Sequence, residues 1–387
     1  MPFYHKVGDI PRVKHTTFHK PDGESLYREE LVSSKGFSGI YSNKYHINLP
    51  TGLIRSGEIR LNKIPDWPDA QTLYMHFFTY EKKSEGNFVS ARNAFLLNND
   101  CVVLTAQVTE DTDDFYRNAL ASEYVYVHHG SGELLSDFGR LRFEAGDQLI
   151  IPRTTTYQLK FDDYSARNYL LIVESSTAYE IPNHYRNDYG QMEEHAPYCE
   201  RDFKRPEFME PIGSKGEYRI IVKAGDRFFE HIAPHHPFGV VGWDGYLYPF
   251  AFNIRDFHPK VGRIHLPPPV HLVFTTGGFI ICNFCPRPYD FHPNAVPAPY
   301  FHSNIDSDEV LYYVDGDFMS RKGVKEGSIT LHPGGMPHGP QPGRTEDSVG
   351  VERTDEWAVM VDTFAPLRPT LNVKETLDEG YPQSWLE

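Results

Sequence analysis

The sequence predicts a mainly β protein that consists of two repeated β modules with few short helices. Windows with apolar residues at a 3.6-residue period are scarce, whereas short β-branched or aromatic runs bounded by Gly, Pro, Asn or Asp recur along the chain. Aromatic residues make up 14% of the 387 residues, which suits a strand-rich core. A repeated spacing of Glu, Gly and Pro in the two halves indicates that one module occurs twice.

Eight segments carry the strand pattern most clearly. Each combines β-branched and aromatic residues and is bounded by turn-forming residues, as strands usually are. In chain order they are SEYVYVHHG, DQLIIP, NYLLIVES, EYRIIVKAG, HLVFTTGGFIICNF, EVLYYVDG, GSITLHPGG and EWAVMVDTF.

The chain divides into four parts by composition. Residues 176–215 are polar and contain several prolines, so we interpret them as a connection between the modules. This predicts an N-terminal arm at 1–60, an N-terminal module at 61–175 and a C-terminal module at 216–387, the last interrupted by the proline-rich LPPPVH.

Charge and composition exclude several classes of function. A formal net charge of −15 argues against nucleic acid and anionic membranes as partners, because phosphate binding normally requires a basic face. Neither a signal-peptide pattern nor an apolar span of membrane length is found, which predicts a cytoplasmic protein. Cys282 and Cys285 form a CxxC, but it lies in a buried-strand pattern, and Cys101 and Cys199 supply no second pair for a zinc ribbon.

The internal repeat gives the C-terminal module a frame of fixed spacings. Glu309 precedes Gly316 by the same spacing that separates Glu123 from Gly130 in the first half. The same holds further along for two Gly-to-Pro spacings, Gly327 to Pro333 and Gly146 to Pro152.

The two copies differ at the positions that could provide nitrogen ligands. His302 and His338 in the second copy correspond to Tyr116 and Tyr157 in the first. Two imidazoles with the carboxylate of Glu309 suit Fe(II), Mn(II) or Zn(II), and such a set leaves open positions on iron. The sequence therefore predicts a metal site in the second copy and none in the first, with Glu309 facing into a barrel together with residues 311 and 313.

Each of these residues has an ordinary alternative interpretation. With 19 histidines in the chain, a single histidine is usually a surface residue or a hydrogen-bonded core residue, and Glu309 alone could be a paired charge. The full pattern H-x-N-x4-E-x6-G followed by G-x5-P-x-G-x2-H is much rarer. It resembles the two consensus motifs of the cupin fold, with Asn304 at the usual second histidine, and it implies a bicupin of two double-stranded β-helix barrels.

Longer segments resemble one enzyme family. APYFHSNIDSDEVLYYVDG, GSITLHPGGMPHGP, VVGWDGYLYPFAFNIRDF and WAVMVDTF are similar to segments of homogentisate 1,2-dioxygenase in its shorter bacterial form. The resemblance covers most of residues 215–365. By position it implies Fe(II) ligands at His302, Glu309 and His338, with Asp308 as the less favoured carboxylate. Ligand type alone does not separate iron from manganese.

The resemblance also implies further site residues. His265 in RIHLPPPVH matches the family's acid/base histidine, although it or His271 could instead brace the loop. The substrate contacts implied are His338, His332 and Tyr313, with Tyr312 in place of Tyr313 if the strand register differs, and His332 alternatively acting behind the ligands.

One substrate contact of the family is missing. A substrate-binding tyrosine of the animal enzymes falls near Phe318, so the substrate carboxylate must be held by another group. Arg321 and Lys322 are candidate cations, though equally ordinary as turn charges.

These residues together lead to an expected function. The resemblance implies an Fe(II)-dependent dioxygenase that converts homogentisate and O2 to maleylacetoacetate in tyrosine and phenylalanine catabolism, in a trimer-based homo-oligomer. Gentisate, 3-hydroxyanthranilate or another hydroxylated aromatic acid is the alternative substrate. A non-catalytic metal-binding cupin regulator and a cupin isomerase that uses Mn(II) or Zn(II) are the alternatives from other classes.

Overall fold

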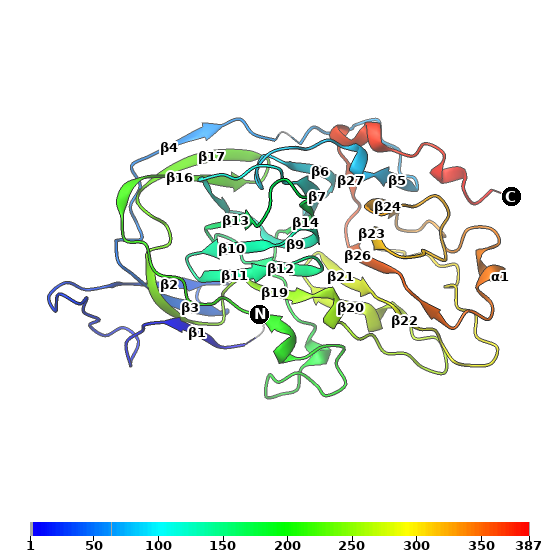
Figure 1. Ribbon diagram of the computed structural model, residues 1–387. Coiled ribbons are helices and arrows are strands. Elements are labelled where there is room, and N and C mark those ends of the chain that lie inside the picture. The colour runs from blue at the N-terminus through cyan, green and yellow to red at the C-terminus, as the bar shows by residue number, and fades with distance from the viewer. Residues whose placement is uncertain (1–2, 63, 387) are drawn as a thin grey trace.

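The computed structural model describes residues 3–62 and 64–386 and shows two β barrels side by side, with the N-terminal arm at one end (Figure 1). Among these residues the only α-helix is α1 (Arg344–Ser348), which confirms the prediction of a mainly β chain with few helices. None of the described helices is long and apolar enough to cross a membrane. The other helical turns are of the 3-10 type: η1 (Thr79–Glu81), η2 (Asn183–Tyr185), η3 (Glu200–Asp202), η4 (Ile254–Asp256), η5 (Pro268–His271), η6 (Leu371–Thr376) and η7 (Tyr381–Gln383).

The N-terminal barrel consists of two sheets that enclose an apolar core. In spatial order, the first sheet contains β15 (Phe203–Lys204), β19 (Phe250–Asn253), β12 (Asp147–Ile151), β9 (Ser122–His129), β14 (Tyr169–Ser175), β7 (Cys101–Gln107), β6 (Arg92–Leu97) and β27 (Arg368–Pro369). The second contains β11 (Gly139–Phe143), β10 (Gly132–Ser136), β13 (Tyr157–Phe161), β8 (Phe115–Asn118), β16 (Lys215–Ala224), β17 (Arg227–His235) and β4 (Arg55–Ile59).

The C-terminal barrel is built on one six-stranded sheet. Its spatial order is β20 (Leu272–Thr275), β21 (Phe279–Phe284), β26 (Trp357–Thr363), β23 (Asp308–Asp315), β24 (Ser328–His332) and β5 (Met75–Phe78). A two-stranded ribbon of β22 (Arg287–Pro288) and β25 (Arg353–Thr354) accompanies it. Three strands of the N-terminal arm join β18 in a four-stranded sheet, in the order β1 (His5–Gly8), β18 (Val240–Gly245), β3 (Tyr41–His46) and β2 (Arg28–Ser33).

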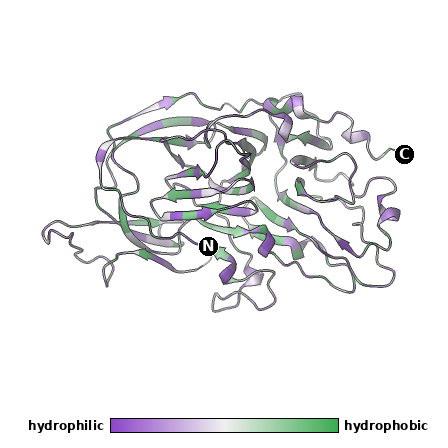
Figure 2. Cartoon of the chain, viewed as in Figure 1, coloured by the Kyte–Doolittle hydropathy of each residue, from purple (hydrophilic) through white to green (hydrophobic). Residues whose placement is uncertain are grey.

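All eight segments with the strand pattern contain strands. They correspond to β9, β12, β14, β16, the hairpin of β20 and β21, β23, β24 and β26. Figure 2 shows hydrophobic residues concentrated on strands of both barrels, with hydrophilic residues alternating along several of them. This alternation is what lets one face of a strand line a core while the other faces elsewhere.

Strands are exchanged between the two modules, and the module boundaries differ from those expected. Strands β16 and β17 pair with β8 and β4, and β19 pairs with β12, so residues 215–253 belong largely with the N-terminal barrel although we assigned 216–387 to the C-terminal module. Conversely, β5 from the N-terminal module pairs with β24. Unpaired strand edges need partners, and which distant strand supplies the partner has no local sequence signal.

A large shared core joins the two barrels. Alternate residues of β23, namely Val310, Tyr312 and Val314, pack in it together with Tyr124 and Tyr126 of β9. The intervening residues of each strand face their own barrel, as Val125 of β9 does in the N-terminal core. Strands that are covered on both faces hold their side chains in fixed positions.

The repeated glycines of the two copies share a backbone conformation. Gly130 and Gly316 follow β9 and β23 with φ of 102° and 98°, and Gly146 and Gly327 have φ of 94° and 78°. A side chain is strained in this left-handed region, so the repeated spacing reflects a repeated backbone path. Gly335 continues the match with φ of 77°, but its counterpart in the first copy is Thr154 with φ of 68°.

Replacement of this threonine tests the strain directly. Thr154 is exposed and β-branched in a conformation that such residues disfavour. We expect Thr154→Gly to raise the free energy of unfolding by up to about 1 kcal/mol in urea denaturation, after the entropy cost of glycine is deducted. Thr155→Gly, at a buried neighbour, should lower it; a loss of stability in both variants would contradict the assignment of strain to Thr154.

Candidate metal centre

The carboxylate of Glu309 lies inside the C-terminal barrel because of its place on β23. Residues at even positions of this strand pack in the shared core, while Leu311 and Tyr313 pack in a separate cluster on the opposite face. Glu309 shares the parity of these two residues, and its side chain is only 7% exposed. The expected inward orientation of residues 309, 311 and 313 is therefore observed.

His302 and His338 are brought together by their own backbones. Neither lies in a long strand, but each backbone N–H donates to the carbonyl of the other at 2.8 Å, which forms an isolated antiparallel bridge. Their ring centroids are 4.4 Å apart. The turn that contains His338 begins at Pro333, whose carbonyl accepts a hydrogen bond from Met336 N.

The three predicted ligands converge. His302 Nε2 lies 3.6 Å from Glu309 Oε2, and His338 Nε2 lies 3.5 Å from Glu309 Oε1. The ligand atoms of all three residues lie within 4.8 Å of one another. This is the spacing expected when three side chains surround one ion.

The second nitrogen of each imidazole is fixed by a backbone carbonyl. His302 Nδ1 lies 3.2 Å from Tyr300 O, and His338 Nδ1 lies 2.9 Å from Met336 O. A protonated Nδ1 that donates to a carbonyl leaves the lone pair on Nε2, directed toward Glu309. Histidine ligands of metals are oriented in this way.

The electrostatics of the site depend on Glu309. Burial alone would raise the pKa of its carboxyl, but the surrounding His302, His332 and His338 lower that pKa well below its usual value. The pKa of His302 is raised, mainly by its interaction with Glu309. A carboxylate that stays ionised in the barrel requires positive charge beside it.

His332 lies behind the carboxylate and not on its open side. The ring is fully buried, with Nδ1 2.7 Å from Glu309 Oε1 and Nε2 2.9 Å from the Tyr381 hydroxyl. Burial lowers the pKa of His332 to about 4, so the ring is neutral at pH 7. His332 is therefore placed to orient Glu309. Both of its ring nitrogens have partners, so the geometry does not support the expected direct contact with substrate.

The neighbouring polar residues are used elsewhere. Both carboxylate oxygens of Asp308 accept backbone N–H groups, from Gly334 and Leu367 at 2.7 Å each. Asp308 therefore fixes two loops, which agrees with the choice of Glu309 over Asp308 as the candidate ligand. Asn304 contributes its backbone carbonyl to Gly335 N at 2.6 Å.

The residues fit a bound cation. His338 Nε2 is buried and lacks a hydrogen-bond partner among the described residues. An orphaned imidazole lone pair is costly in a barrel interior unless an ion or a water meets it. Two neutral imidazoles and one carboxylate are the donor set that a divalent transition metal prefers.

His265 lies at the exposed side of the cluster. Its Nδ1 is 3.1 Å from Asp290 Oδ2, and its ring packs edge-on against Tyr300 with a centroid distance of 5.1 Å. The Tyr300 ring in turn lies 6.1 Å from that of His302. His265 therefore reaches the site through Tyr300, with Asp290 fixing its orientation, whereas His271 is buried against Phe284.

Phe318, near which the substrate-binding tyrosine of the animal enzymes falls, and the residues around it are buried in the barrel. Phe318 packs against Tyr313 at 4.6 Å, and the Tyr313 hydroxyl lies 3.3 Å from Thr330 Oγ1. Arg321 is 7% exposed and was not expected to be buried. Its Nη1 donates to Gly339 O at 2.5 Å, its Nε has no partner, and no described carboxylate lies within salt-bridge distance.

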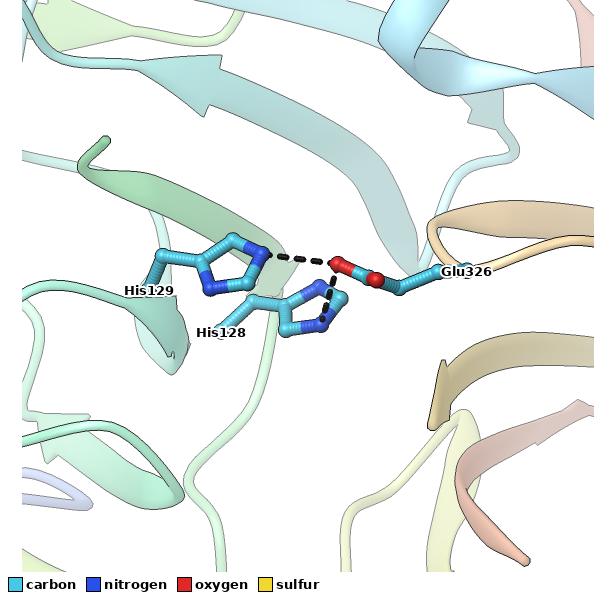
Figure 3. A group of neighbouring side chains, drawn as sticks. All are labelled: His128, His129 and Glu326. Atoms are coloured by element: carbon cyan, nitrogen blue, oxygen red, sulfur yellow. Dashed lines mark hydrogen bonds and ion pairs between the residues drawn. The ribbon is translucent and has the colours of Figure 1, made fainter. Parts of the chain in front are cut away.

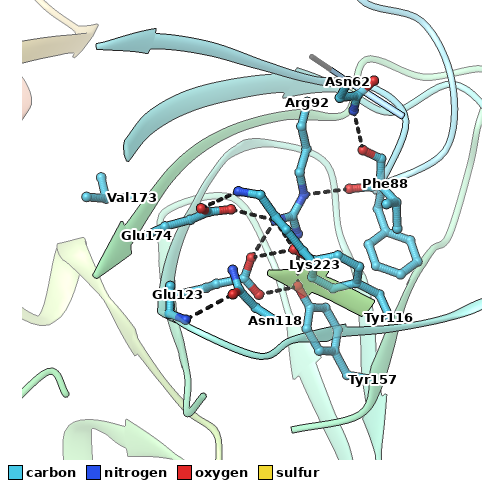
Figure 4. Close-up of polar contacts among 12 residues, drawn as sticks. Asn62, Phe88, Arg92, Tyr116, Asn118, Glu123, Tyr157, Val173, Glu174 and Lys223 are labelled. Carbon is cyan, nitrogen blue, oxygen red and sulfur yellow. Dashed lines mark hydrogen bonds and ion pairs between the residues drawn. The ribbon is translucent and has the colours of Figure 1, made fainter. Parts of the chain in front are cut away.

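The N-terminal barrel contains the counterpart of this site around an arginine (Figure 4). The guanidinium of Arg92 contacts the carboxylate of Glu123 and donates to Tyr116 OH at 3.3 Å and Tyr157 OH at 2.9 Å. Its three partners, Glu123, Tyr116 and Tyr157, occupy the repeat positions of Glu309, His302 and His338. A protein cation thus lies where the other barrel could hold a metal ion.

A further ion pair completes this cluster. Glu174 Oε1 lies 3.6 Å from Arg92 Nη1, and its other oxygen pairs with the ammonium of Lys223. All four charged side chains are at most 5% exposed. The buried charges therefore balance as two cations and two carboxylates.

Removal of the guanidinium should destabilise the protein strongly. Arg92→Met leaves two buried carboxylates facing one ammonium, so we expect a loss of about 3–5 kcal/mol in the free energy of unfolding, measured by urea denaturation. Arg92→Met combined with Glu123→Gln should lose less, because the second change removes the unpaired charge. A single variant within about 1 kcal/mol of the parent would show that the guanidinium is not needed there.

Several site residues were not expected from the sequence. Arg92 carried one signal, since it is a charged residue at the start of RNAFLL, the segment that forms β6. Tyr381 and Trp385 reach the site from the far C-terminal end, with Trp385 Nε1 3.1 Å from Gly339 O. Asp362, whose Cα pairs with that of Glu309 across β23 and β26, adds a second carboxyl; burial and the charge of Glu309 raise its pKa well above the usual value.

Comparisons of sequence relate the chain to dioxygenases. The family model "Homogentisate 1,2-dioxygenase N-terminal" matches residues 89–254. A "Putative dioxygenase" of Saccharolobus solfataricus is 41% identical over all of this chain and 99% of its own length. The homogentisate 1,2-dioxygenase of Bradyrhizobium diazoefficiens is 27% identical, and the alignment covers 70% of this chain and 63% of that enzyme.

Solved structures give a weaker comparison. A cupin 2 conserved barrel domain protein from Leptotrichia buccalis matches with a TM-score of 0.34 at 11% identity, over 79% of this chain and all of its own. A point mutant of Bacillus subtilis oxalate decarboxylase also gives 0.34 at 11% identity, over 83% and 85% of the two chains. Scores this low carry no argument, and the two-barrel fold rests on the strand pairing described above.

Proposed function

The chain belongs to the homogentisate 1,2-dioxygenase family, and on that premise we propose that it is an Fe(II)-dependent ring-cleaving dioxygenase that converts homogentisate and O2 to maleylacetoacetate. The convergence of His302, Glu309 and His338 in one barrel is the observation that supports this most. The relatives named as homogentisate 1,2-dioxygenases support the substrate, although the chain aligns with only 63% of their length.

His302, Glu309 and His338 would hold the iron. Two imidazole nitrogens and one carboxylate leave coordination positions free for a substrate oxygen and for O2. Bound iron would supply the one-electron chemistry that O2 needs in order to react with an aromatic ring. The overall reaction balances without another reductant, because both oxygen atoms enter the product as a ring carbon–carbon bond breaks.

His265 would accept the phenolic proton of the substrate. Asp290 near Nδ1 holds the imidazole so that Nε2 is left available, at the exposed side of the cluster next to Tyr300. Histidine is the side chain that most often acts as a general base. Tyr300 would form a wall against which the ring of the substrate is oriented.

Arg321 would hold the substrate carboxylate. A guanidinium without a described carboxylate partner in a barrel interior is costly, and an anionic ligand would remove that cost. Its unpartnered Nε offers the geometry for a bidentate contact. This role would replace the hydroxyl that Phe318 lacks.

The first test measures oxygen uptake by protein loaded with Fe(II) without air. With homogentisate we expect rapid uptake and formation of the ring-opened product, followed by absorbance. His332→Phe removes a partner that orients a ligand and should weaken iron binding by about 10- to 100-fold. Glu309→Gln removes a ligand itself, so it should lose bound iron and reduce oxygen uptake by more than roughly 100-fold.

Asp306→Asn is the matched control, since Asp306 is an exposed carboxylate on the same segment. It should retain both iron and activity. If iron-loaded protein consumed no oxygen with any hydroxylated aromatic acid, the proposal would fail and a metal-binding regulator would replace it.

Phe318 favours a second candidate substrate within the same chemistry. Because a substrate-binding hydroxyl is replaced there, gentisate or another hydroxylated aromatic acid remains an alternative to homogentisate. Comparison of uptake rates among these acids with the same iron-loaded protein decides between them.

A second prediction concerns Arg321. Arg321→Met should raise the KM for homogentisate by about 10- to 100-fold, equivalent to roughly 1.5–3 kcal/mol for a lost charge-assisted hydrogen bond. The KM for methylhydroquinone, which lacks the carboxylate, should stay unchanged, and Arg321→Lys should be intermediate because it keeps the charge. Lys322→Met is the control, and equal changes for both substrates would assign Arg321 a structural role only.

A further inference from the structure

Two adjacent histidines at the boundary of the barrels point to the same side of one strand. Neighbouring strand residues normally face opposite sides of a sheet. In β9, however, His129 pairs with Tyr169 and Val127 pairs with Leu170, so His128 is the extra residue of a β-bulge. The bulge lets the two imidazoles stack, with centroids 4.3 Å apart and planes within 13°.

A carboxylate from the other barrel meets both rings (Figure 3). Glu326 lies in the turn between β23 and β24, and its Oε1 is 2.8 Å from His129 Nε2 and 3.5 Å from His128 Nε2. The ligand atoms of the three residues lie within 4.8 Å of one another, as they do in the barrel site. Glu326 and His129 are partly exposed, so an ion could enter from solvent.

We propose that His128, His129 and Glu326 form a second metal site, for a divalent cation such as Zn(II), which links the N-terminal barrel to the β23–β24 turn. Two imidazoles and a carboxylate are ordinary zinc ligands, and a water molecule completes four-coordination. The site shares no residue with His302, Glu309 and His338.

The other ring nitrogen of His128 is already held by a neighbour. Tyr312 OH lies 2.6 Å and Tyr80 OH 3.0 Å from His128 Nδ1. A partner on Nδ1 fixes the ring and directs Nε2 toward Glu326, as in known histidine–metal arrangements. Tyr80 OH also donates to Glu326 Oε1 at 2.9 Å, so its oxygen already lies beside the ligands.

One cation near the site competes with a metal only weakly. Arg167 Nη1 lies 3.8 Å from Glu326 Oε1, and both side chains are more than 40% exposed. Such exposed pairs contribute little. The guanidinium is also held 3.7 Å above the Tyr80 ring, where it can remain when an ion binds Glu326.

The test counts zinc ions bound to metal-stripped protein by isothermal titration and elemental analysis. Glu309→Gln disables the barrel site, and this variant should still bind one Zn(II) and melt at a higher temperature when zinc is present. Adding Glu326→Gln or His129→Gln should remove that zinc and the thermal shift. Glu346→Gln, an exposed carboxylate on α1, is the matched control and should leave both unchanged.

Two results would overturn the proposal. One is a Glu309→Gln protein that binds no zinc; the other is zinc that persists in both double variants, which would indicate adventitious binding. Arg167→Gln gives an independent test that leaves every ligand in place. In the Glu309→Gln background, removal of the Arg167 charge should increase the affinity for zinc. If this affinity is unchanged, and if zinc also stays bound when Glu326 is replaced, the ion binds elsewhere.

Discussion

The arrangement of both barrels depends on the neutralisation of one buried carboxylate in each. Glu123 and Glu309 occupy equivalent strands, and an unpaired carboxylate at either position would cost several kcal/mol. In the N-terminal barrel the guanidinium of Arg92 supplies the positive charge. In the C-terminal barrel three histidines surround the carboxylate, and one of them retains a buried lone pair without a partner. The first barrel is therefore complete by itself, whereas the second fits a cation.

The residues that flank each carboxylate explain why the two copies differ. Burial raises the pKa of Tyr116 and Tyr157 well above the usual value, so both phenols stay neutral. A neutral phenol donates to a carboxylate or accepts from a guanidinium but is a poor metal ligand. Imidazole at the same positions offers a neutral lone pair at pH 7. A change of residue type at two positions thus separates a structural ion pair from a candidate metal site on one backbone frame.

Much of this was predictable from local patterns. The strands followed from β-branched and aromatic runs between turn-forming residues. The repeated glycines and the H-x-N-x4-E spacing located His302, Glu309 and His338 before any geometry was known. Pairing between distant strands was not predictable in this way. The placement of 215–253 with the N-terminal barrel depends on edges that form only when the sheets assemble.

Burial of charged side chains was likewise not predictable from the sequence. Arg321 follows a turn, which usually means an exposed cation, yet Gly339 and Trp385 from later segments enclose it. Such environments arise from tertiary contacts, and a single sequence records only the residue type.

The buried arginine also resolves a conflict between the charge of the protein and its proposed substrate. A chain with a net charge of −15 repels an aromatic carboxylate at long range, although salt screens most of that repulsion beyond about 10 Å. Recognition must therefore come from short-range contacts in a region of low dielectric, where a single guanidinium has far more effect than in water. Arg321 lies in such a region, buried near Glu309. On the proposed function, the barrel would attract one anion locally while the surface as a whole would not, and the same placement would favour acids over neutral hydroquinones.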